Sequence, residues 1–207
     1  MTSDAVPPPD SAGAPAPRRR AAVHETRVDG FGTVRVVPVD PARDTDLLYR
    51  WVTQERARFW GMLDHTREQV REIYEHLDSL STHHAYLIHR DDRPVALFQT
   101  YRPEADPIGE YYDVRPGDFG FHLMVGPAEG EPEPGFTGTL VTVFLTHVLA
   151  EDPGRRRIVA EPDARNERAQ ARLVRAGFVL GPEVRLPHKR ARLAFLDRDS
   201  FLSRTTR

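Results

Sequence analysis

The hydrophobic and polar positions of residues 33–52 predict a strand followed by a helix. TVRVVPV, from Thr33, alternates apolar and basic residues, as an edge or half-buried strand does. In the next segment, the run LLYRWV at 47–52 places its apolar residues on one side of a helix. Either Asp44 or Asp46 can cap this helix, because a short side-chain oxygen can accept from the free backbone N–H groups of the first turn.

The pattern of residues 66–101 predicts a second helix and a β-hairpin. Thr66 and Gln69 have the spacing of a capping box, and apolar residues then recur at a helical period through 70–80. AYLIHR at 85–90 and PVALFQTY at 94–101 are both apolar runs, and the polar segment between them contains turn-forming residues. We therefore expect the order strand, helix, helix, strand, strand.

The segment after the hairpin predicts a parallel pair of strands. A polar loop covers 103–116, and FGFHLMV at 119–125 is nearly all apolar, as in a strand buried on both faces. A helix at 137–150 separates this strand from RIVA at 157–160. A strand, a helix and a second strand in this order imply a right-handed parallel crossover.

The last part of the domain is expected to hold one helix and two strands. Asn166 is placed to cap this helix, and Gly177 is placed to end it. Two closing strands follow at 178–184 and 191–196. The alternation of helices and strands predicts an α/β fold without internal repeats.

Composition divides the chain into a tail and one domain. Residues 1–22 are rich in Pro and Ala and cannot bury enough apolar surface to offset the entropy of ordering. We expect a disordered tail there and a single domain at 23–207. The basic triplet at 18–20 could contact an acidic partner, although a solvated run of charge is the better interpretation.

Charge and residue counts exclude several classes of function. The formal net charge of -2 argues against a nucleic-acid-binding protein. The sequence contains no cysteine, which excludes thiolate metal sites, disulfides and a cysteine nucleophile. It also lacks an apolar run long enough for a membrane span or a signal peptide, so a cytoplasmic protein is expected. Lys189 is the only lysine, which draws attention to that side chain.

Four motifs resemble the GNAT superfamily of acyl-CoA N-acyltransferases, and within it the branch that forms siderophore hydroxamates. They are the FW pair at 59–60, GDFGFHLMVG at 117–126, EPDARN at 161–166 and PHKRA at 187–191. The resemblance extends over about 34–201. It implies a mixed, splayed central β-sheet flanked by helices, and it implies an active site formed by His122 and Asp163.

The same two residues suit the chemistry of acyl transfer. A nitrogen that attacks a thioester must lose a proton as the tetrahedral intermediate forms, and histidine can accept that proton near neutral pH. The carboxylate of Asp163 would then orient the imidazole of His122 and stabilise its cation. The alternatives are a histidine of the core and an aspartate that only caps a turn.

The resemblance also implies where acyl-CoA would bind. The pantetheine arm would lie along the strand at Leu123, Met124 and Val125, with one backbone group polarising the thioester carbonyl. The pyrophosphate would bind at the start of the next helix, where free N–H groups favour anions. The backbone residues expected there are Gly135, Thr137, Gly138 and Thr139, and Asn166 would reach the pantetheine amide. The segment PGFTGT departs from the superfamily loop [QR]-x-x-G-x-[GA] and carries no charge, so a plain loop-to-helix turn is the alternative.

The acceptor side is predicted from segments that flank the acceptor pocket in the siderophore branch. The candidate substrate-binding residues are Trp60, Gln99, Tyr101, Glu104, Tyr112, Asp113 and Lys189. Glu104 or Asp113 could hold a distal ammonium group. Lys189 could bind a substrate carboxylate or a CoA phosphate, or it could be a solvent-facing lysine of a hairpin. The histidines at 65, 76, 83 and 84 lack the spacing of metal ligands, so no metal site is expected.

The expected function is transfer of an acyl group from acetyl-CoA or succinyl-CoA to the hydroxylamine nitrogen of an N-hydroxylated diamine or N6-hydroxylysine. The transfer would be direct, in a monomer or homodimer, with no nucleic-acid or membrane partner. Two alternatives remain open, which are a GNAT enzyme that acetylates an ordinary amine and a non-catalytic CoA-binding module.

Overall fold

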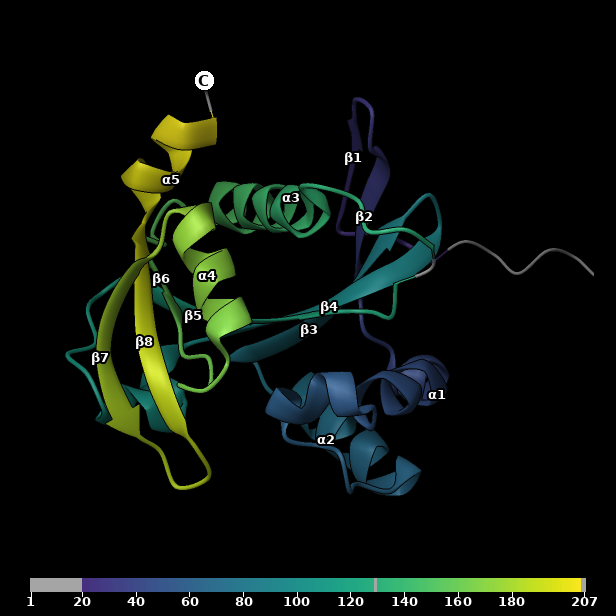
Figure 1. The fold of residues 1–207 in the computed structure, drawn as a ribbon, viewed down its shortest axis with the longest axis horizontal. Coiled ribbons are helices and arrows are strands. Elements are labelled where there is room, and N and C mark those ends of the chain that lie inside the picture. The colour runs from purple at the N-terminus through teal and green to yellow at the C-terminus, as the bar shows by residue number, and fades with distance from the viewer. Residues whose placement is uncertain (1–19, 129, 206–207) are drawn as a thin grey trace, which may run out of the picture.

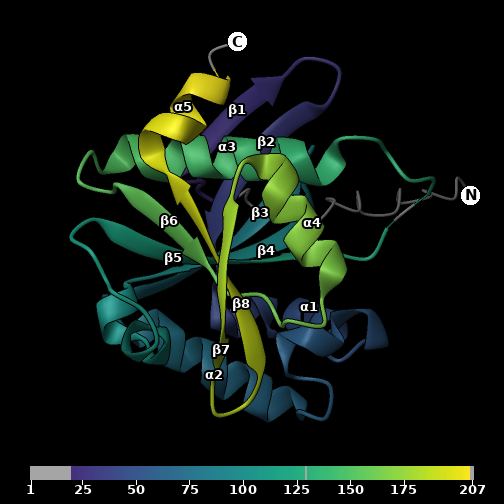
Figure 2. The same ribbon diagram turned by 60° about the vertical axis from the view of Figure 1, so that its left-hand side comes forward.

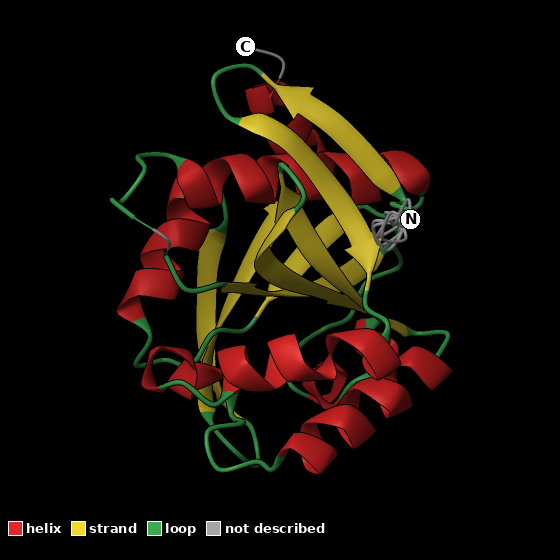
Figure 3. Cartoon of the chain, turned by 90° about the vertical axis from the view of Figure 1, so that its right-hand side faces the viewer, coloured by secondary structure: helices red, strands yellow, loops and turns green. Residues whose placement is uncertain are grey.

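The computed structural model describes residues 20–128 and 130–205, which form a central β-sheet with helices on both faces (Figures 1 and 3). The strands are β1 (His24–Val28), β2 (Gly32–Pro38), β3 (His83–Arg90), β4 (Arg93–Tyr101), β5 (Asp118–Val125), β6 (Arg157–Ala160), β7 (Val179–Arg185) and β8 (Arg190–Asp197). The α-helices are α1 (Pro41–Val52), α2 (Arg67–Ser79), α3 (Phe136–Glu151), α4 (Glu167–Ala176) and α5 (Arg198–Thr205). The 3₁₀ helices are η1 (Glu55–Trp60), η2 (Pro103–Ala105) and η3 (Pro107–Glu110).

The sheet is mixed, as expected. Its strand order is β1-β2-β3-β4-β5-β6-β8-β7. Only β5 and β6 pair in parallel, and the other neighbouring strands are antiparallel. Helix α3 connects the two parallel strands and crosses one face of the sheet, while α1 and α2 cover the opposite face (Figure 2). The α/β class predicted from the sequence is confirmed.

Alternating side chains of the central strands divide the core between the two faces. Phe98 and Phe121 point toward α3, and the Phe98 ring lies 4.5 Å from the ring of Phe144 in that helix. Leu97 and Met124 point the other way and pack among buried residues of α1 and α2. Because side chains alternate along a strand, His122 shares the face of Met124 and lies on the α1–α2 side of β5.

The parallel pair is held together at one end and open at the other. Pairing of β5 with β6 covers only the residues from Asp118 to Gly120. At this end Arg157 donates from Nε and an Nη to the two carboxylate oxygens of buried Asp118, at 2.7 and 2.6 Å. Beyond Gly120, β5 continues along β4 alone as far as Val125. The two strands therefore diverge toward their carboxyl ends, as the expected splayed sheet requires.

Of the N-caps predicted for the first two α-helices, one is confirmed and the other lies at a different residue. The capping box of Thr66 and Gln69 is present at the start of α2, as predicted. The first helix begins earlier than expected, because Asp40 is its N-cap and accepts from the backbone N–H of Ala42, followed by a proline at the first helical position. Asp44 therefore lies inside the first turn and does not cap the helix.

The sequence patterns missed two elements at the ends of the domain. Strand β1 adds an edge to β2, and α5 follows β8 with Phe201 buried in the main core. The expected tail at 1–22 lies outside the described residues except for its last three, where Arg20 forms a 2.6 Å ion pair with Asp44.

Within 20–128 and 130–205, no helix has the length and apolar content needed to cross a membrane. The same part of the chain contains no group of three or more His, Asp or Glu side chains arranged to hold a metal ion.

Candidate active site

His122 lies on β5 just beyond the point where β6 diverges. Its side chain is 34% exposed, whereas the side chain of Glu161 beside it is 5% exposed. Its cross-strand partner on β4 is Gln99, whose Oε1 lies 3.4 Å from His122 Nδ1. His122 Nε2 lies 2.5 Å from Glu161 Oε1. Both ring nitrogens therefore have protein partners, and the ring still reaches solvent.

Glu161 is the centre of the site's hydrogen bonds. It directly follows β6, so the end of that strand aims its carboxylate at the neighbouring β5. The Tyr101 hydroxyl donates to Oε2 at 2.5 Å, and Lys189 Nζ lies 3.5 Å from Oε1. The His122 imidazole, the Tyr101 hydroxyl and the Lys189 ammonium group thus surround a single buried carboxylate.

A glycine in β5 makes room for Tyr101. Tyr101 pairs with Gly120 across the β4–β5 ladder, and its ring covers the Gly120 backbone. A Cβ atom at position 120 would lie 1.9 Å from Tyr101 Cζ, so every other residue type would displace the ring. The close approach lets the tyrosine reach Glu161 and places its ring centroid 4.9 Å from that of His122.

The charges of the site fix the tautomer of the histidine. Burial alone would raise the pKa of Glu161, but the charge and hydrogen bond of His122, with Lys189 and Tyr101, lower that pKa to about 2. Burial and the adjacent carboxylate raise the pKa of Tyr101 well above its usual value, so its hydroxyl stays a donor. An ionised carboxylate can only accept, so His122 Nε2 carries a proton and Nδ1 is the nitrogen that can act as a base.

The acid beside the histidine is Glu161 and not the expected Asp163. Both carboxylate oxygens of Asp163 accept from Arg165, at 2.8 to 2.9 Å. These hydrogen bonds lower the pKa of Asp163. The chain turns after β6 toward β8, where Asp163 bridges Ala191 and the neighbouring Pro162 carbonyl accepts from the Arg192 N–H. Asp163 therefore fixes the loop to β8 and makes no hydrogen bond to the imidazole.

The carboxyl half of β5 presents backbone groups on its open side. Gly126 N donates to Val95 O in β4, and Gly117 O accepts from Arg156 N on the β6 side. Backbone groups alternate along a strand, so those of Leu123 and Val125 point away from β4, toward the side that β6 has left. Met124, the third residue expected there, points its backbone groups at β4 instead.

The expected anion site at α3 has an uncovered helix start. Gly135 is the N-cap, with a φ of 80° and no side-chain cap. Thr139 N already donates to Gly135 O at 2.9 Å, which leaves the N–H groups of Thr137 and Gly138 in the free first turn. A Cβ at Gly138 would meet no atom within 4 Å, so the backbone there is open to an approaching group. Asn166 caps α4 by accepting from Ala169 N at 3.1 Å.

Four of the predicted acceptor residues gather around His122. Gln99, Tyr101 and Lys189 are described above, and the Trp60 ring stands edge-on to the imidazole at 6.2 Å between centroids. The other three lie elsewhere. Glu104 is exposed in η2, Tyr112 donates to Asp118 at 3.1 Å, and Asp113 is exposed and lies 4.0 Å from Arg115.

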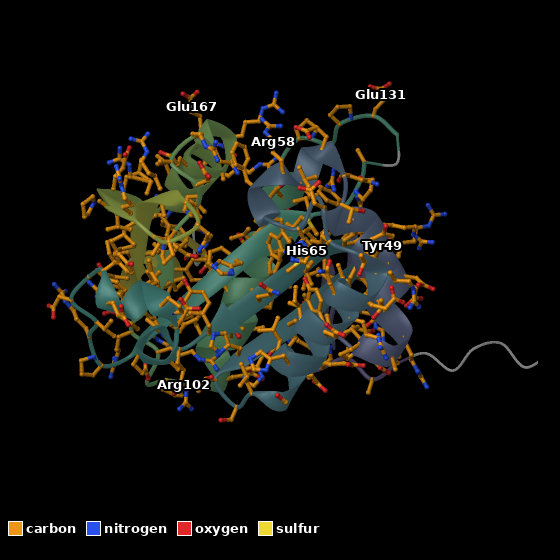
Figure 4. All side chains as sticks on the ribbon, turned by 90° about the horizontal axis from the view of Figure 1, so that it is seen from below. Tyr49, Arg58, His65, Arg102, Glu131 and Glu167 are labelled. Carbon is orange, nitrogen blue, oxygen red and sulfur yellow. The ribbon has the colours of Figure 1, made fainter. Side chains whose placement is uncertain are left out.

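Sequence reasoning assigned no role to Glu161 or Arg56. Arg56 in η1 donates to the carbonyl of Val125, on the open side of β5. η1 and the start of α4 flank this side of the molecule (Figure 4, where Arg58 and Glu167 mark them), and the Arg165 guanidinium lies 5.7 Å from the centroid of the Phe59 ring. The position of Glu161 directly after an apolar strand was a usable signal, whereas nothing in the sequence pointed to Arg56.

Two relatives have similar sequences. An Escherichia coli protein named N(6)-hydroxylysine O-acetyltransferase is 32% identical over 79% of this chain and 52% of its own length. An N-hydroxyputrescine acetyltransferase of Acinetobacter baumannii is 23% identical over 77% of this chain and 75% of its own length. The chain thus spans about half the length of the E. coli relative.

Solved structures show the same fold. An uncharacterized protein from Bacillus halodurans has a TM-score of 0.80 at 23% identity, covering 91% of this chain and 96% of that one. Aminoglycoside acetyltransferase AAC(6')-Ib, in complex with coenzyme A, has a TM-score of 0.72 at 24% identity, covering 84% and 99%. The acetyltransferase (GNAT) domain model matches residues 40–186, which include β4, β5, β6, His122 and Glu161. The chain therefore belongs to the GNAT acetyltransferase family.

Proposed function

We propose that the protein transfers an acyl group from acyl-CoA to the nitrogen of an N-hydroxylated amine, forming a hydroxamate. The observation that carries this proposal is the buried Glu161, which holds His122 by Nε2 and leaves Nδ1 as a base where β5 and β6 diverge. The names of the relatives from E. coli and A. baumannii favour a hydroxylated lysine or diamine as the acceptor.

The acyl donor would bind along the open side of β5. An extended pantetheine arm can pair with the backbone of Leu123 and Val125, and a strand N–H can stabilise the developing oxyanion. The first turn of α3 offers free N–H groups to the phosphates. The acyl donor that we propose for this position is acetyl-CoA or succinyl-CoA, as expected from the sequence.

The acceptor would react beside His122. The hydroxylamine nitrogen attacks the thioester carbon, and its proton passes to Nδ1 while Glu161 stabilises the resulting imidazolium. The tetrahedral intermediate then expels the CoA thiolate, which takes up the proton. A hydroxylamine is mostly neutral at pH 7, so the base is required only during attack. Trp60, which stands edge-on to the imidazole, and Lys189, which lies 3.5 Å from Glu161 Oε1, are the side chains we assign to contact with the acceptor.

Release of free CoA thiol tests the proposal. The donors are acetyl-CoA and succinyl-CoA, and the acceptors are N-hydroxycadaverine, N6-hydroxylysine and their unhydroxylated parents. The proposal expects release only with a hydroxylated acceptor. Release with the parent amines alone would assign the protein to the ordinary amine acetyltransferases, and tight CoA binding without release on any acceptor would indicate a binding module.

The product identifies the reacting atom. The E. coli relative is named an O-acetyltransferase, and a hydroxylamine offers both a nitrogen and an oxygen nucleophile. Acylation at nitrogen gives a hydroxamate, which forms a coloured ferric complex, whereas acylation at oxygen does not. A colourless product of the correct mass would refute transfer to nitrogen while retaining the acyltransferase activity.

A further inference from the structure

Gln99 connects His122 to a second buried hydroxyl. Its Nε2 lies 3.5 Å from the Tyr74 hydroxyl on α2, and its Oε1 lies 3.4 Å from His122 Nδ1. Tyr74 is buried, and Gln99 is half-buried between the two partners. The sequence suggested that Gln99 binds substrate. In the structure its amide contacts the basic nitrogen of the site.

The far end of this connection is the buried Tyr74 hydroxyl. In the present arrangement Gln99 Nε2 donates to the Tyr74 oxygen, at 3.5 Å. The Trp60 indole N–H is also buried and makes no hydrogen bond within the described part of the chain. Burial raises the pKa of Tyr74, so its hydroxyl keeps its proton and can both donate and accept.

The amide of Gln99 has two orientations that suit two states of His122. When Nδ1 is unprotonated, the Gln99 NH₂ can donate to it and the Gln99 oxygen can accept from Tyr74. When Nδ1 is protonated, the Gln99 oxygen accepts from it and the NH₂ faces Tyr74, as the present arrangement has it. The Tyr74 hydroxyl tolerates both orientations, because a hydroxyl can donate and accept. The amide oxygen and nitrogen have the same shape, so turning the amide displaces no neighbour.

We propose that the Gln99 amide turns over as His122 Nδ1 gains and loses its proton, so that one positioning residue serves both states of the base. This inference rests on the proposed role of His122 in acyl transfer. A partner that could only donate would face the N–H of the protonated Nδ1 with a second donor. A partner that could only accept would face the lone pair of the unprotonated Nδ1 with a second acceptor. Glutamine opposes neither, so it keeps the ring in place throughout the reaction.

The other groups around the imidazole do not perform this role. Glu161 stays ionised against Nε2, Lys189 reaches the site through Glu161, and Tyr101 donates to Glu161 as well. Trp60 faces the ring edge-on. None of these groups forms a hydrogen bond with Nδ1. Within the described part of the site, Gln99 is therefore the side chain whose hydrogen bond can change when Nδ1 gains or loses its proton.

Nuclear magnetic resonance can follow both partners during a pH titration. The Gln99 side-chain amide signals, assigned by their loss in Gln99→Glu, should shift with the same midpoint as the ¹⁵N signals of His122. The amide of Gln170 is a fixed internal reference, because it donates to the Ala164 carbonyl at 2.9 Å. Gln99 signals that stay constant while His122 titrates would overturn the proposal.

Gln99→Glu provides a second measurement that needs no acceptor. A carboxylate can only accept, so the midpoint of His122 should rise by about 1–3 units, as for an opposite charge at this range. Gln69→Glu is the matched control, because it makes the same chemical change at an exposed capping-box position that accepts glutamate. An unchanged His122 midpoint in Gln99→Glu would overturn the proposal.

The kinetics separate this inference from the proposed function. If hydroxylamine acylation occurs, the acidic limb of the kcat/KM profile should move up with the His122 midpoint in Gln99→Glu and stay fixed in Gln69→Glu. Coupled titration of Gln99 and His122 in a protein without turnover would support the amide partner and refute the function. Turnover with an unmoved acidic limb in Gln99→Glu would refute the amide partner alone.

Discussion

Replacing Glu161 by glutamine separates the charge of the site's central carboxylate from its shape. The amide keeps the volume and can still accept from Tyr101, but it gives Lys189 and the His122 Nε2 proton no anionic partner. The tautomer of the imidazole is then no longer fixed by charge. We expect the variant to lose both stability and turnover.

The magnitude of the stability loss follows from the pKa of the carboxyl group. Burial opposes ionisation, yet His122 and its neighbours hold the pKa of Glu161 at about 2, against an ordinary value of 4.5. This difference corresponds to about 3 kcal/mol of folding stability at neutral pH. Because the folded-state pKa is the lower one, the contribution is present above the unfolded pKa and disappears as the pH falls through the folded value. At pH 3 it should be about 1 kcal/mol.

Urea unfolding of Glu161→Gln and the parent at pH 7, 5, 4 and 3 measures this contribution. The control is Glu75→Gln, which removes an exposed ion pair to Arg71 and should cost less than about 1 kcal/mol. The turnover of Glu161→Gln should fall by roughly 10²- to 10⁴-fold in the thiol-release assay. A stability difference between Glu161→Gln and the parent that is the same at pH 7 and pH 3 would refute the assignment of a buried, ionised carboxylate.

Three further substitutions test the supports of the site. Gly120→Ala brings a Cβ to 1.9 Å from Tyr101 Cζ, so thermal unfolding should show a loss of about 1–3 kcal/mol together with reduced turnover; full retention of both would contradict the close approach. Arg157→Met leaves the carboxylate of Asp118 buried without its bidentate partner, and urea unfolding should report a loss of about 3–5 kcal/mol. Asp163→Asn should keep kcat within about tenfold of the parent in the thiol-release assay, because its contacts are to Arg165 and β8 and not to the base. A larger fall in kcat would restore the role that the sequence suggested.

Local patterns were sufficient for most of the fold. The capping box at Thr66, the β3–β4 hairpin and the parallel strands around α3 were predicted because each depends on residues close together in the sequence. The missed strand β1 and helix α5 depend on distant partners: β1 pairs along β2, and α5 is fixed by burial of Phe201 in the main core. An isolated segment of five or eight residues carries little periodicity from which to infer such packing.

The arrangement of the candidate site also depends on packing between distant segments. The motifs pointed to His122 and to the segment after β6, which the structure brings together, but which carboxylate of that segment lies beside the histidine depends on where the segment leaves the sheet. Glu161 still stands at the end of β6, beside β5, whereas Asp163 has already joined β8. Two residues of extended chain cover about 7 Å, which is more than the reach of a hydrogen bond. The divergence of β5 and β6 therefore opens one side of β5 and also determines which carboxylate remains within reach of the histidine.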